Sequence, residues 1–125
     1  MDIFFTDREL DVMAVLWQGG SGTVSEVRDG LDDALAYTTV LTILRTLEEK
    51  GFVTHVAEGK AHRYLPAVTA DLAGKSALSR VLDKIFGGSS ELLLTQLVSD
   101  RNLDPAELRR LRKLLDERLG AKKTR

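Results

Sequence analysis

The order of the periodic segments limits the fold of this chain more than any other feature. Apolar residues recur at helical spacing from Asp7 to Gln18 and from Tyr37 to Lys50, with a short helical pattern between these segments. Two β-compatible runs follow, Phe52 to Ala57 and Ala61 to Pro66, and Glu58-Gly59-Lys60 between them has the length and chemistry of a hairpin turn. Three helices followed by a hairpin predict a winged helix-turn-helix.

Capping residues predict where the N-terminal helices begin and end. Thr6 and Glu9 have the spacing of a capping box at the start of the first helix. Thr23-Val24 can form a very short strand, after which Ser25 is the expected cap of the second helix. Gly51 stands where the third helix needs a residue of left-handed conformation in order to end.

Three further amphipathic helices are predicted after the hairpin. Gly87-Gly88 separates the first two, and Pro105 occupies the first position of the last. The expected N-caps are Thr69 or Asp71, then Ser89 or Ser90, and then Asp104. The fold class is therefore mainly α with a small β-hairpin wing.

The C-terminal apolar faces need a partner, because a small winged head offers little core to cover them. We expect a winged helix-turn-helix domain at 1–68 and a helical dimerisation domain at 69–125, with a second copy of the chain as the partner. Packing within one chain is the alternative. The residues expected at the dimer interface are Leu78, Val81, Leu82, Ile85, Leu93, Leu97, Leu108, Leu111 and Leu115.

Composition excludes several classes of protein. The 125 residues include no cysteine, which excludes disulfides and thiolate sites and favours the cytoplasm. No apolar run approaches the roughly 18 residues of a membrane span. Glycine-rich phosphate loops, nucleophile elbows and metalloprotease motifs are also missing from the sequence, so we expect neither an enzyme nor a cofactor.

Charge is distributed unevenly along the chain. Residues 1–68 hold six Lys and Arg against eleven Asp and Glu, whereas residues 69–125 hold twelve against eight. An acidic N-terminal half argues against nucleic-acid binding, which usually needs a basic surface. The local arrangement of charge must therefore decide the question.

The predicted third helix has one face without any acid. If Val40, Ile43, Leu44 and Leu47 face the core, the remaining positions point away from it: Thr38, Thr39, Leu41, Thr42, Arg45 and Thr46. Threonine suits phosphate oxygens and thymine methyls, and arginine can bind guanine with two hydrogen bonds. This face fits the major groove of DNA, although an ordinary solvated helix face is the alternative.

The hairpin adds cationic and imidazole donors that could reach the DNA backbone beside the groove. The full set of residues expected to contact DNA is Tyr37, Thr38, Thr39, Thr42, Arg45, Thr46, Lys60, His62 and Arg63. Two other functions stay open. His55 and His62 could together bind a metal in a small hydrolase, and the same surfaces could bind a protein instead of DNA.

Three segments resemble the penicillinase repressor family of winged-helix regulators, of the BlaI and MecI type. They are Glu9 with Leu10 to Trp17, Ala36 to Thr42 with Leu47, Lys50 and Gly51, and Ala61-His62-Arg63-Tyr64 before Pro66. The resemblance implies a homodimer that places the third helix of each head in a palindromic double-stranded DNA operator. It also implies repression by promoter occlusion, at β-lactam-resistance or related stress genes.

The resemblance further implies release by a membrane sensor protease that acts upstream of cleavage in the C-terminal domain. The family's cleaved bond is Asn-Phe, and Gln96-Leu97 aligns with it here. The chain departs from the family pattern at this bond, which weakens the expectation of proteolytic release.

Overall fold

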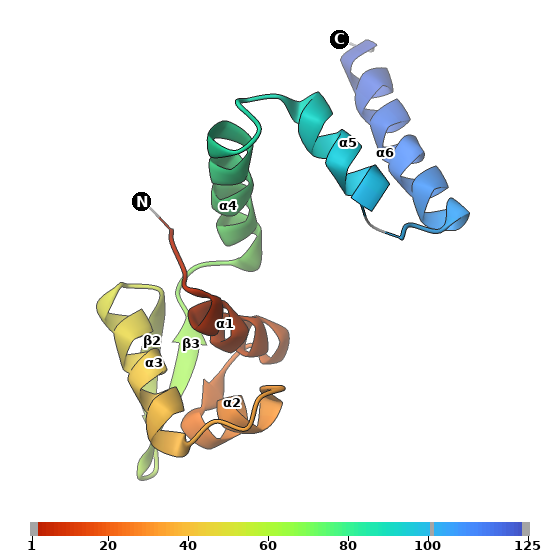
Figure 1. Cartoon of the computed structure of the whole chain (residues 1–125). Coiled ribbons are helices and arrows are strands. Elements are labelled where there is room, and N and C mark those ends of the chain that lie inside the picture. Colours follow the sequence, from red (N-terminus) through yellow and green to blue (C-terminus); the bar gives the residue numbers. More distant parts are fainter. Residues whose placement is uncertain (1–2, 101, 124–125) are drawn as a thin grey trace. The chain divides into compact units, whose positions relative to one another are not determined.

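The predicted order of elements is confirmed in the computed structural model, which describes residues 3–100 and 102–123 (Figure 1). Its helices are α1 (Asp7–Gly19), α2 (Val24–Gly30), α3 (Tyr37–Glu49), α4 (Ala70–Lys84), α5 (Ser90–Asp100) and α6 (Pro105–Lys123). Its strands are β1 (Gly22–Thr23), β2 (Val53–Glu58) and β3 (Ala61–Pro66). The chain divides into two compact units, Met1–Ser79 and Arg80–Arg125.

Local hydrogen bonds explain where the first helices begin. The Thr6 hydroxyl accepts from the Glu9 amide at 3.2 Å, and the Glu9 carboxylate accepts from the Thr6 amide at 2.8 Å, which confirms the capping box. The predicted Ser25 cap is wrong. Thr23 caps α2 instead, and its hydroxyl accepts from the Glu26 amide at 3.2 Å. The helix therefore begins at Val24, two residues earlier than a Ser25 cap would place it.

The end of α3 determines the start of the hairpin. Gly51 has φ 85°, as predicted, so the chain can reverse there without a Cβ clash. The Phe52 amide donates to the Leu47 carbonyl at 3.0 Å and the Gly51 amide donates to the Glu48 carbonyl at 3.0 Å, which is a Schellman motif. This turn carries Phe52 into the core and leads into β2.

The three strands form an antiparallel sheet in the order β1-β3-β2. Glu58 pairs with Ala61, so the hairpin loop is the two residues Gly59-Lys60. Gly59 has φ 60°, which suits the first position of a type II′ turn. β1 pairs with β3 only at Gly22 and Thr23, and the outer part of the hairpin is joined to no other strand.

One hydrophobic core holds the first unit together. α3 buries three side chains completely, Val40, Leu44 and Leu47. They pack in one cluster with buried residues of α1, α2, the sheet and the chain around them: Ile3, Val12, Met13, Leu16, Val24, Val27, Phe52, Val53, Tyr64, Val68 and Ala73. Leu41, which the sequence pattern placed on the outward side of α3, is half-buried and packs against this core.

The first unit extends into α4. Thr69 caps this helix through the Leu72 amide at 3.1 Å, and Ala73 is buried in the core. The compact unit therefore ends at Ser79, later than the expected domain boundary between residues 68 and 69. The assignment of separate functions to 1–68 and 69–125 stays a prediction.

The second unit lacks a buried core of its own. Ser89 caps α5 through the Leu92 amide at 3.1 Å, and Asp104 caps α6 through the Glu107 amide at 2.7 Å, as predicted. Yet no side chain in 80–100 or 102–121 is buried. No helix in the described residues is long and apolar enough to cross a membrane.

A partly buried ion pair joins the start of α1 to the C-cap of α3. Glu9 is 4% exposed, and both of its carboxylate oxygens accept from Lys50 Nζ, at 2.9 and 2.8 Å. Burial raises the pKa of Glu9, but hydrogen bonds from Lys50 and Thr6 outweigh it and hold the pKa below its usual value. The pair fixes how α3 lies against α1.

Replacing Lys50 with Met tests this pair. We expect the free energy of unfolding to fall by about 2 kcal/mol at pH 7, because a buried carboxylate loses its charged partner. Glu9 has a lowered folded pKa, so its stabilising effect is present above the unfolded pKa and disappears as pH falls through the folded pKa. Urea denaturation should therefore show a smaller difference between the two proteins at pH 3.

The matched control is Lys60→Met at the hairpin tip, which should change stability by less than about 0.5 kcal/mol. An equal decrease in the free energy of unfolding in both variants would show that Lys50 contributes no more to stability than a surface lysine does.

Candidate nucleic-acid interface

The outward face of α3 carries the residues that the sequence predicted. Because Val40, Leu44 and Leu47 are buried, helical periodicity turns the other side to solvent. Tyr37, Thr38, Thr39, Thr42 and Arg45 are exposed, and Thr46 is half-buried. No acidic residue occurs in α3 before Glu48. The face therefore meets a polyanion without carboxylate repulsion along most of its length.

Two threonines on this face bond back to their own helix. The Thr42 hydroxyl donates to the Thr38 carbonyl at 2.9 Å, and the Thr46 hydroxyl donates to the Thr42 carbonyl at 3.0 Å. Their hydroxyl hydrogens are therefore occupied, while the oxygen lone pairs and methyl groups stay available. Such side chains suit base amino groups and thymine methyls better than phosphate oxygens, which can only accept.

The N-terminus of α3 is open to an anion. Its N-cap is Ala36, which has no side chain that can satisfy the helix amides. The first amides to bond back to the Ala36 carbonyl are those of Thr39 and Val40, at 3.1 and 3.2 Å. Two amides before them, those of Tyr37 and Thr38, lie at the positive end of the helix dipole. A phosphate could accept hydrogen bonds at this end of the helix.

Arg45 is the cation of this face. It is exposed, and within the part of the chain that the structure describes it forms no ion pair or side-chain hydrogen bond. Tyr64 lies beneath this region of α3. Burial raises the pKa of Tyr64, with Glu48 acting in the same direction and Arg45 opposing it. The phenol therefore stays neutral beside the arginine.

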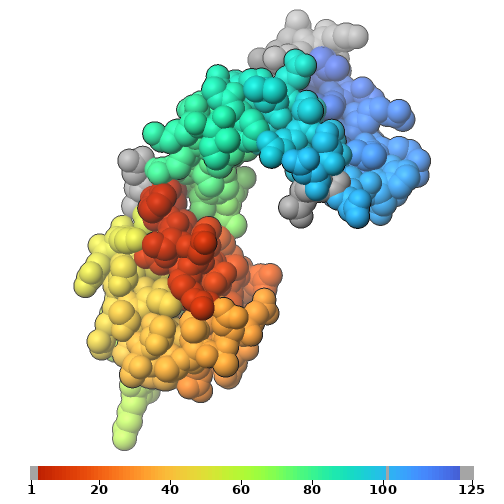
Figure 2. Space-filling view, viewed as in Figure 1, coloured from red at the N-terminus to blue at the C-terminus, as the bar shows by residue number. Residues whose placement is uncertain are grey.

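The hairpin protrudes from the first unit, as its yellow-green tip in Figure 2 shows. Lys60 lies in its two-residue loop and is exposed. His62 is also exposed and stacks on His55, with ring centroids 4.2 Å apart, while His55 Nδ1 lies 2.6 Å from Glu48 Oε2. The described residues contain no group of three or more metal-binding side chains, so the metal alternative gains no support.

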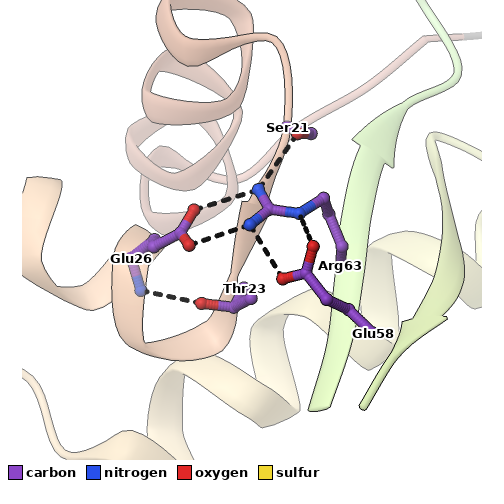
Figure 3. Close-up of polar contacts among 5 residues, drawn as sticks. All are labelled: Ser21, Thr23, Glu26, Glu58 and Arg63. Atoms are coloured by element: carbon purple, nitrogen blue, oxygen red, sulfur yellow. Dashed lines mark hydrogen bonds and ion pairs between the residues drawn. The ribbon is translucent and has the colours of Figure 1, made fainter.

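Arg63 lies among acidic partners that the sequence did not reveal (Figure 3). Its guanidinium donates to both carboxylate oxygens of Glu26, at 3.0 and 2.9 Å, and to both of Glu58, at 2.9 Å each. It also donates to the Ser21 hydroxyl at 3.1 Å. The hydrogen bonds from Arg63 hold the pKa values of Glu26 and Glu58 below their usual range. All five N–H groups of Arg63 are thus occupied within the protein, and its contact with phosphate stays a prediction.

The alternation of side chains along β3 indicates that Arg63 and His62 have different surroundings. Neighbouring residues of a strand point to opposite faces, so His62 and Arg63 cannot share one face of β3. The hairpin register places Arg63 opposite Thr23 on one side and Val56 on the other. Glu26 is 37 residues away in sequence, so no local pattern marked it as the partner.

The residues expected at the dimer interface lie on α4, α5 and α6. Five are exposed, namely Leu78, Ile85, Leu97, Leu108 and Leu115, and four are half-buried, namely Val81, Leu82, Leu93 and Leu111. Ile85 is 72% exposed and Leu115 53%. Gln96 and Leu97, the expected cleavage site, are exposed inside α5.

Comparison with known proteins identifies the family. The sequence profile described as penicillinase repressor matches residues 5–117. The chain is 26% identical over 120 residues to a penicillinase repressor of Bacillus licheniformis, covering 94% of each. It is 36% identical over 118 residues to the transcriptional regulator BlaI of Mycobacterium tuberculosis, strain H37Rv, covering 89% of this chain and 82% of the relative.

A solved structure agrees with these sequence matches. The solution structure of the DNA binding domain of the repressor BlaI is 30% identical, with a TM-score of 0.51, over 56% of this chain and 88% of that one. The winged-helix fold and the expectation of a regulator rather than an enzyme are confirmed. The chain belongs to the penicillinase repressor family of transcriptional repressors.

Proposed function

We propose that this chain represses transcription as a homodimer that binds a palindromic DNA operator. The observation that carries the proposal is the outward face of α3, which is free of acids before Glu48 and has an uncapped N-terminus and an unpaired Arg45. Residues 1–68 bind DNA, and residues 69–125 form the dimer. The similar BlaI structure is described as a DNA binding domain, which supports the same role for this head.

The proposed contacts follow from the chemistry of each side chain. Arg45 binds guanine in the major groove, and Thr39, Thr42 and Thr46 contact thymine methyls or base amino groups. Tyr37 and Thr38 lie at the open helix N-terminus and bind phosphate. In the wing, Lys60 and His62 contact the sugar-phosphate backbone.

Dimer formation explains the surface of the second unit. Its helices expose large apolar side chains, and a second copy would bury them around a two-fold axis. Two heads held in this way would bind two half-sites. Because the N-terminal half is acidic, one head alone has little non-specific affinity, and the second half-site supplies the rest.

Regulation and location are proposed by analogy with the family. The protein acts in the cytoplasm at β-lactam-resistance or related stress genes, downstream of a membrane sensor protease. Cleavage at Gln96-Leu97 would require local unwinding, because this bond lies inside α5. Release by a route other than cleavage fits the departure from the Asn-Phe bond.

Fluorescence anisotropy with a promoter fragment and an unrelated duplex tests the DNA interface. Arg45→Ala should weaken promoter binding by about 10- to 100-fold, because a bidentate contact to guanine is lost. Thr42→Ala alone should reduce the preference for the promoter fragment over the unrelated duplex. Folding should not change, since both side chains are exposed.

Lys75→Ala removes one exposed positive charge outside the proposed interface and serves as the control. If neither Arg45→Ala nor Thr42→Ala changes promoter affinity, the groove assignment is refuted. If the unmodified protein prefers neither duplex, the alternative of a protein-interaction module is favoured.

Light scattering coupled to size-exclusion chromatography tests the dimer. Leu115→Asp should halve the measured mass at micromolar concentration, because it places a charge in the proposed apolar interface. Promoter affinity should fall as well. Lys113→Asp, on the opposite side of α6, should leave the mass at that of a dimer. A monomeric parent protein would contradict the proposal directly.

A further inference from the structure

Arg63 links the outer half of the hairpin to α2 through hydrogen bonds. Beyond the pair of Thr23 with Arg63, no third strand among the described residues joins the hairpin. Arg63 bridges this gap, because Glu58 lies beside the hairpin loop and Glu26 lies in the first turn of α2 (Figure 3). Glu26 is itself fixed at the start of α2, where its amide donates to the Thr23 hydroxyl.

Geometry makes this bridge specific for arginine. Both carboxylates are bound through paired hydrogen bonds, and all five distances from Arg63 lie between 2.9 and 3.1 Å. A guanidinium offers five N–H groups in a fixed plane, whereas a lysine ammonium offers three from a single atom. The Arg63 side chain is 25% exposed, while the carboxylates are about half exposed.

The bridge also sets the local charge of the wing. Glu58 lies next to the loop that contains Lys60, the residue proposed to contact the DNA backbone. Without Arg63, the carboxylates of Glu26 and Glu58 would be two uncompensated negative charges near a phosphate backbone. With Arg63 in place, the guanidinium offsets one of these two charges, and the three groups together carry a net charge of about −1.

We propose that Arg63 is a positioning residue, which supports DNA binding through Glu26 and Glu58 by holding the wing on α2 and neutralising both carboxylates, and does not itself contact phosphate. This inference rests on the proposed function. It assigns the single wing arginine to the protein's own architecture and leaves Lys60 as the wing cation that touches DNA.

Salt-dependent binding to the promoter fragment separates the two roles. Arg63→Gln should weaken binding at least tenfold and reduce the slope of log affinity against log salt, because salt screens the repulsion between the two uncompensated carboxylates and the DNA backbone. The triple variant Glu26→Gln/Glu58→Gln/Arg63→Gln should restore the salt slope of the parent protein but only part of its affinity, because it removes the uncompensated carboxylates and not the loss of the bridge. Lys60→Gln is the matched control, and it should reduce the slope by about one.

Hydrogen exchange in the absence of DNA tests the bridge independently. In Arg63→Gln, amides of 58–63 should exchange faster, while those of α1 should not change, because the wing loses its attachment and the core does not. This measurement tests the bridge even if the parent protein shows no preference for promoter DNA. That outcome would contradict the proposed function and leave the structural role of the bridge unchanged.

Two results would overturn the inference. One is a salt slope that stays reduced by about one in the triple variant, which would make Arg63 a direct phosphate contact. The other is unchanged exchange of the wing amides in Arg63→Gln, which would show that the hairpin does not need the bridge.

Discussion

Burial of one side of α3 determines the rest of the first unit. Val40, Leu44 and Leu47 are fully enclosed, and each such side chain contributes about 1.5–3 kcal/mol relative to exposure. A rotation of α3 about its axis would expose them and bury threonines, so the outward face is strongly specified. The carbonyl of Leu47 then closes the turn that brings Phe52 into the core. The position of the wing thus follows from the burial of the helix.

Local chemistry explains why most of the fold was predictable. Thr6 with Glu9, Gly51, and Asp104 act on neighbours within a few residues, so their patterns can be recognised in sequence. The error at the start of α2 shows the limit of this approach. Thr23 and Ser25 are both suitable caps, and the deciding sign was Glu26 three residues after Thr23, at capping-box spacing.

The candidate site was predictable only where one helix carries it. Periodicity alone placed Thr38, Thr42 and Arg45 on a common face. The hydrogen bonds of Arg63 were not predictable because its partners come from α2, β2 and the segment before β1, and residue type alone does not distinguish a bonded arginine from a free one. The exposed leucines of α4, α5 and α6 indicate a need for burial without naming the partner.

The distribution of ion pairs resolves the conflict between an acidic N-terminal half and a DNA-binding role. Glu9 is bound by Lys50, and Glu26 and Glu58 share Arg63. These carboxylates are bound by cations of the head itself, and none of them belongs to the outward face of α3 before Glu48, so the net charge does not describe that face. Few free cations remain on that surface, and affinity for arbitrary DNA should be correspondingly small. Selectivity for one DNA sequence then depends on base contacts rather than on net charge.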